Sequence, residues 1–88
     1  MQALLDAIAR MDLPTDAQRI FHGRGGLHPG CEQWTLDAYP PVFVLTSFLP
    51  AGDETGAQLA AVGAALARRW EALAPGQPTR VQVAETVL

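Results

Sequence analysis

The chain has 88 residues, 49% of them hydrophobic and 17% charged, and its 6 basic and 9 acidic residues give a formal charge of −3. A chain of this length holds one domain with a small core and leaves no room for a second domain. The acidic balance excludes long-range attraction of polyanions, so any contact with a nucleic acid must be local. The single cysteine cannot form an internal disulfide, which favours a reducing compartment, and we expect a cytoplasmic protein.

The N-terminal segment predicts a short amphipathic helix that ends before Pro14. Its apolar residues recur at helical spacing, namely Leu4, Leu5, Ile8 and Met11. The segment has neither the basic start nor the continuous apolar core of a signal peptide. No apolar run in the chain approaches the roughly 20 residues of a membrane span, so we expect no membrane partner.

Three strand patterns follow along the chain. Residues 17–21 predict a first strand, and residues 31–36 alternate apolar and polar side chains, as a half-buried strand does. Residues 37–41 supply a turn, in which Asp37 is expected to bond nearby backbone amides. Residues 42–49 form a nearly unbroken apolar run, which is typical of a central strand covered on both faces.

A long helix is predicted to begin after Asp53 or Thr55, either of which can cap its first turn. One apolar stripe runs along it, made of Leu59, Val62, Leu66, Trp70 and Leu73. Because Trp34 also lies on the apolar side of its strand, we expect both tryptophans in the core rather than stacked on unpaired bases. Arg68 and Arg69 are expected to be solvated near the end of the helix.

The last segment restarts the alternation of a strand over residues 80–88, after a Pro-Gly-Gln-Pro stop at residues 75–78. A strand, a long helix and another strand form a crossover unit, so the third and fourth strands should be parallel. The sequence therefore predicts an α+β fold of order α-β-β-β-α-β, with a small mixed sheet of about four strands.

The connection between the first two strands is the most informative segment. It contains five residues expected to form a turn on unusual backbone: Gly23, Gly25, Gly26, Pro29 and Gly30. The planar fork of an arginine suits phosphate or a base edge, and imidazoles can add hydrogen bonds. The candidate substrate-binding residues are therefore Arg19, His22, Arg24 and His28. The alternative is a hairpin connection that contacts no ligand.

The same connection has two other interpretations. His22, His28 and Cys31 are potential metal ligands, but they lack a fourth ligand and a paired Cys-x-x-Cys. Cys31 would act as a nucleophile only if His28 activated it and Asp37 oriented that histidine. We expect neither a metal site nor catalysis in this chain.

A resemblance to a known family covers nearly the whole chain. Residues 18–30, the run Thr35-Leu36-Asp37-Ala38-Tyr39 and the apolar run 42–48 resemble the domain that precedes the catalytic domain of class I S-adenosylmethionine-dependent RNA methyltransferases. The likeness is strongest to those that act on cytosine-5 of large-subunit ribosomal RNA. In that family a helix precedes an Arg-Leu/Ile strand, a Gly-rich turn, a strand that closes in Asp-Arg-Tyr/Phe, an apolar strand, a helix and a strand.

This resemblance implies that residues 1–88 are one accessory domain that positions RNA for methylation and catalyses nothing by itself. Its partners would be RNA and its own C-terminal catalytic domain, which would bind S-adenosylmethionine. Two rival interpretations stay open. One is a structural or dimerisation module, a homodimer whose exposed strand edge pairs with a neighbour. The other is a small free-standing enzyme that uses Cys31.

Overall fold

The computed structural model describes residues 1–23, 33–48 and 55–85. It contains, in chain order, α1 (Gln2–Arg10), β1 (Gln18–His22), β2 (Trp34–Tyr39), β3 (Val42–Ser47), α2 (Thr55–Leu73) and β4 (Arg80–Glu85). This order confirms the predicted α+β fold.

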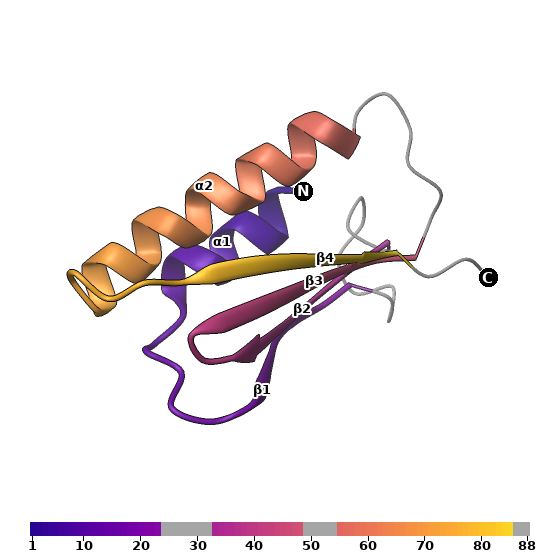
Figure 1. Cartoon of the computed structure of the whole chain (residues 1–88). Coiled ribbons are helices and arrows are strands. Elements are labelled where there is room, and N and C mark those ends of the chain that lie inside the picture. Colours follow the sequence, from indigo (N-terminus) through magenta and orange to yellow (C-terminus); the bar gives the residue numbers. More distant parts are fainter. Residues whose placement is uncertain (24–32, 49–54, 86–88) are drawn as a thin grey trace.

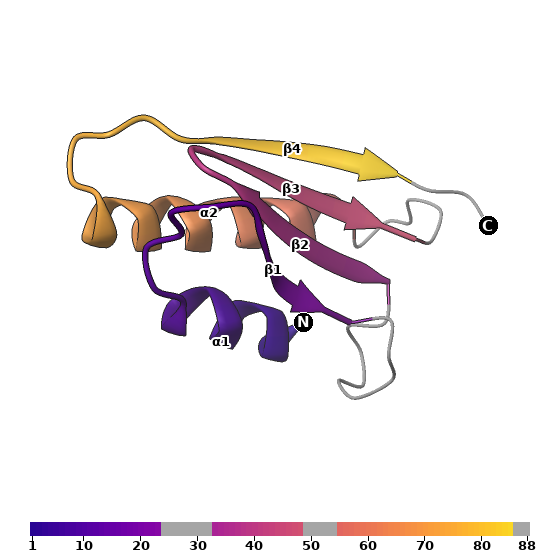
Figure 2. The ribbon, with the colours of Figure 1, turned by 90° about the horizontal axis from the view of Figure 1, so that it is seen from below.

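The four strands form one mixed sheet in the spatial order β1-β2-β3-β4. β1, β2 and β3 pair antiparallel, and β4 runs parallel to β3 after the crossover through α2. Both helices lie on the same face of the sheet, as Figures 1 and 2 show. None of the described helices covers the opposite face.

The core fills the space between the helices and the covered face of the sheet. Its buried apolar residues are Leu4, Ile8, Met11, Phe21, Trp34, Leu36, Ala38, Phe43, Leu45, Val62, Leu66 and Trp70. The rings of Phe43 and Trp70 meet edge to face, with centroids 5.8 Å apart. The indole N–H of Trp70 donates to the Gln77 carbonyl at 2.9 Å. Both tryptophans are therefore core residues, as predicted.

Arg69 joins the two helices. Its Nε and Nη2 atoms donate to the Met11 carbonyl oxygen at 2.9 and 2.6 Å. Met11 has extended backbone and ends α1, where the last carbonyls of a helix lack partners within the helix. The prediction of a solvated Arg69 is wrong because this acceptor, 58 residues away along the chain, lies beside α2.

Two strand predictions are also wrong. Asp37 lies within β2 rather than in a turn, because Arg19 stands opposite it on β1 and supplies a partner for its charge. The turn is confined to Pro40 and Pro41, whose peptide bond is cis. β3 is buried on alternate residues only, because the described helices cover a single face of the sheet.

Replacing Arg69 with methionine should lower the free energy of unfolding by about 1–3 kcal/mol, because the variant keeps an apolar stem but removes both charged donors from the Met11 carbonyl. The matched control is Arg68→Met, one residue earlier on the exposed side of α2, which should change it by less than about 0.5 kcal/mol. Urea unfolding followed by circular dichroism measures both. Equal urea midpoints for Arg69→Met and Arg68→Met would contradict a stabilising role for the hydrogen bonds from Arg69 to the Met11 carbonyl.

Candidate functional site

The face of the sheet that lies away from the helices carries most of the polar side chains of the strands. Cross-strand pairing and alternation along each strand define this open face. Its residues are Arg19, His22, Thr35, Asp37, Tyr39, Val42, Val44, Thr46, Arg80, Gln82 and Ala84. We use the term open face for this set below.

A bulge in β1 brings two of the candidate residues together. Arg19 pairs with Asp37 and His22 pairs with Thr35, and the register shifts between Arg19 and Phe21. Residues three apart on a regular strand lie on opposite faces. The extra residue of the bulge reverses that alternation and places both Arg19 and His22 on the open face.

The Arg19 guanidinium bonds to two neighbours at once. Its Nε donates to Asp37 Oδ1 at 2.8 Å and its Nη2 reaches Oδ2 at 3.5 Å. Its Nη1 lies 3.2 Å from His22 Nδ1, which accepts if the ring carries its proton on Nε2. The contacts with Asp37 and His22 together fix the planar guanidinium of Arg19 on the open face.

Arg19 remains cationic and accessible within this cluster. The hydrogen bond to Asp37 raises the pKa of Arg19, the charge of Asp37 raises it further, and Tyr39 adds a smaller effect in the same direction. The Arg19 side chain is 52% exposed and that of Asp37 17% exposed. Each terminal guanidinium nitrogen keeps a second N–H beyond the described contacts, so Arg19 can still donate to an incoming anion.

Tyr39 and a second arginine extend the polar surface across the sheet. Tyr39 is 54% exposed at the end of β2. It pairs with Val42 on β3, which in turn pairs with Arg80 on β4. Arg19 lies in the opposite direction from Tyr39, on β1, where it pairs with Asp37 of β2. The register therefore places exposed Tyr39 on the open face between Arg19 on β1 and Arg80 on β4. Sequence reasoning missed this grouping because the three residues come from three strands.

The structure places only part of the predicted turn. The Gly23 N–H donates to the Trp34 carbonyl at 2.9 Å, so Gly23 continues the β1–β2 pairing. Among the described glycines, positive φ occurs at Gly76, at 78°. The other predicted turn and site residues lie outside the described residues, namely Arg24, Gly25, Gly26, His28, Pro29 and Gly30, and so does Cys31.

Within residues 1–23, 33–48 and 55–85, no three histidine, cysteine, aspartate or glutamate side chains gather as a metal site would require. None of the helices in that part of the chain is long and apolar enough to cross a lipid bilayer.

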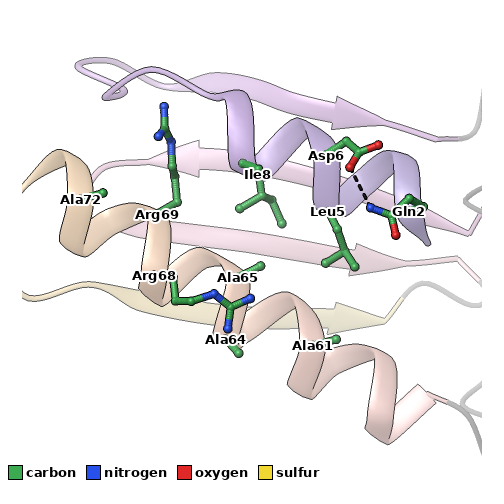
Figure 3. Close-up of a pocket in the computed structure, with 11 residues that line it drawn as sticks. Gln2, Leu5, Asp6, Ile8, Ala61, Ala64, Ala65, Arg68, Arg69 and Ala72 are labelled. Atoms are coloured by element: carbon green, nitrogen blue, oxygen red, sulfur yellow. Dashed lines mark hydrogen bonds between the residues drawn. The ribbon is translucent and has the colours of Figure 1, made fainter.

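A hollow of about 620 Å³ lies on the other side of the molecule, between α1 and α2. Figure 3 shows the small side chains of α2 along it, including Ala61, Ala64 and Ala65. The Asp6 carboxylate at its rim accepts a hydrogen bond from Gln2 Nε2 at 2.7 Å. Three charged residues also line it, namely Asp6, Arg68 and Arg69. Asp6 is bonded to Gln2 and Arg69 to the Met11 carbonyl, and the rest of the lining is mostly apolar, so the open face is the better candidate site.

The chain matches no family model, no curated protein and no solved structure.

Replacing Asp37 with asparagine should change the free energy of unfolding by less than about 1 kcal/mol, because the Arg19 side chain is about half exposed and solvent screens the pair. A raised pKa of Arg19 means that the pair stabilises the fold fully below the ordinary pKa of arginine, and this effect is lost only as the pH rises above that value through the raised pKa of the folded state. The difference between wild type and variant should therefore be equal at about pH 7 and about pH 9. Urea titrations at both pH values measure it, with Asp16→Asn in the exposed loop as the control.

Proposed function

We propose that the chain is a non-catalytic domain that positions RNA for an S-adenosylmethionine-dependent methyltransferase domain, and that the open face contacts the RNA. The observation that carries this proposal is the exposed Tyr39 on the open face, on a strand between those that carry Arg19 and Arg80. The methyltransferase part rests on the resemblance of residues 18–48 to the domain that precedes the catalytic domain in that family.

The chemistry of this surface suits single-stranded RNA. A base stacks on an exposed aromatic ring with about 1–3 kcal/mol, whatever its identity. Guanidinium groups on either side can bind the phosphates next to that base, and unpaired loops are the usual targets of sequence-specific RNA recognition. Because the chain carries a net charge of −3, binding depends on these few cations rather than on the field of the whole domain.

The proposal assigns no chemical step to this chain. Arg19 bonds to both His22 and Asp37, and this arrangement holds a cation for binding rather than activating a nucleophile. S-adenosylmethionine belongs to the following domain in the proposal, since its glycine-rich binding loop has no counterpart in residues 1–88. The role left to this chain is to hold the RNA in position.

Replacing Tyr39 with alanine should weaken binding of a short fluorescent single-stranded RNA about 5- to 150-fold, the equivalent of one lost stacking contact. Fluorescence anisotropy at low salt measures the affinity, and circular dichroism checks the fold. Arg68→Met, on α2 and away from the open face, is the control and should leave affinity unchanged. An unchanged affinity for Tyr39→Ala would remove the open face as the RNA contact.

Replacing Arg19 or Arg80 with methionine should lower the slope of log affinity against log salt by about 0.7 each, as expected for one lost phosphate contact on single-stranded RNA. The same anisotropy titrations at several salt concentrations measure the slope. A slope equal to that of the wild type would show that neither arginine contacts phosphate.

The methyltransferase part of the proposal has its own test. The gene is sequenced beyond the codon for Leu88, and the full natural protein is incubated with tritiated S-adenosylmethionine and unmethylated ribosomal RNA. We expect methyl transfer that falls in the Tyr39→Ala and Arg24→Ala variants. A reading frame without a methyltransferase domain would contradict this part and leave the RNA-binding result standing.

A further inference from the structure

β4 is an edge strand without the usual protection. It pairs with β3 over a regular register from Val42↔Arg80 to Ser47↔Glu85, and none of the strands that the structure describes lies on its other side. Natural edge strands are blunted by bulges, prolines or several charges. β1, at the opposite edge, has a bulge, whereas β4 contains no proline and carries its two charged residues, Arg80 and Glu85, only at its ends. The outer edge of β4 is therefore open to pairing.

The side chains of this edge are apolar on the helix-covered side of the sheet. Val81 pairs with the buried Phe43, and Val83 pairs with the buried Leu45. Val83 nevertheless remains 49% exposed, since the strand lies beyond the part of the sheet that α2 covers. Figure 2 shows β4 displaced sideways from α2. An apolar neighbour added to this edge would bury both valines.

The direction of the backbone groups follows from one hydrogen bond. The Arg80 N–H donates to the Pro41 carbonyl at 3.2 Å, so the backbone of Arg80 points toward β3. In a parallel ladder both groups of a residue point to the same neighbour, and successive residues alternate. The N–H and C=O groups of Gln82 therefore face β3, and those of Val81 and Val83 face outward.

We propose that the outer edge of β4 binds β4 of a second copy of this chain, antiparallel, with Gln82 on the two-fold axis. This two-fold axis is perpendicular to the sheet, so the helices of both copies lie on the same side of the joined sheet. A residue on one face of β4 must then lie opposite a residue on the same face of the partner's β4. Gln82 then lies opposite the partner's Gln82, and Val81 opposite the partner's Val83.

This register satisfies both the hydrogen bonds and the side chains. Val81 and the partner's Val83 each present outward N–H and C=O groups, as a hydrogen-bonded antiparallel pair requires. The two symmetry-related pairs bring valine against valine on the helix-covered side. A register centred on Val83 would instead place Val81 opposite the charged position 85. Because the strand complements itself in this way, a second copy is the occupant that the edge fits.

The dimer would join two four-stranded sheets into one continuous sheet with all helices on one side. The open faces of the two copies would then form a single surface. The inference does not depend on RNA binding, since the edge and the open face use different groups.

Sedimentation equilibrium of the 88-residue chain tests the inference. At about 0.1–1 mM chain, a range that reveals weak self-association, we expect a mass of twice the 9.4 kDa of one chain. Val83→Pro removes one outward N–H, which an edge strand tolerates, and should give a folded monomer. Val83→Ala keeps the N–H and should still dimerise. A monomeric wild type, or a Val83→Pro variant that is still dimeric, would overturn the inference.

A cross-link tests the register and stands even if Val83→Pro fails to fold. In a Cys31→Ser background, Gln82→Cys places two thiols across the axis, in a pair whose Cα atoms lie about 4.5 Å apart, within the range of a disulfide. Mild oxidation should convert most of this variant to a covalent dimer on a non-reducing gel. Ala84→Cys, which lies opposite the partner's Arg80, is the control and should form no covalent dimer on the same gel. Cross-linking at position 84 rather than 82 would overturn the proposed pairing.

Discussion

The contact between Trp70 and Phe43 holds the two layers of the molecule together. One ring comes from the last turn of the long helix and the other from a central strand, and they meet edge to face at 5.8 Å. The same helix reaches the end of α1 through the two hydrogen bonds from Arg69 to the Met11 carbonyl. Every described helix is thereby held on one face of the sheet, and the open face and the free edge of β4 both follow from this one-sided packing.

The open face brings its polar groups together through the geometry of β1. Without the bulge between Arg19 and Phe21, the side chain of His22 would point into the core face and that of Arg19 away from it. With it, a cation, an imidazole and a carboxylate form one hydrogen-bonded cluster beside an exposed tyrosine. Bulges of this kind commonly re-aim a side chain near a functional site. Arg19 and Arg80 together exceed the single charge of Asp37, so the open face of an acidic domain carries one more positive than negative side chain.

The proposed RNA surface and the proposed dimer edge use the sheet in different ways. RNA binding relies on side chains that stand perpendicular to the sheet, whereas dimerisation relies on backbone groups in its plane. A small sheet covered on one side has both kinds of surface available. The two proposals are therefore compatible, and a dimer would place two copies of the Tyr39 surface side by side.

Local patterns in the sequence were enough to predict the helices, the order of the elements along the chain and the burial of both tryptophans, because each depends on residues close together along the chain. The parallel pairing of β3 with β4 followed from the general rule for a strand–helix–strand crossover. The chemistry of the open face was not predictable in the same way. Arg19 and Asp37 are 18 residues apart and Met11 and Arg69 are 58 apart, so no local pattern relates them. A bulge likewise depends on the pairing of two strands rather than on one. The sequence by itself determined which residues are apolar and how they repeat; only the tertiary structure decided which polar residues meet, because that requires distant segments to be packed together.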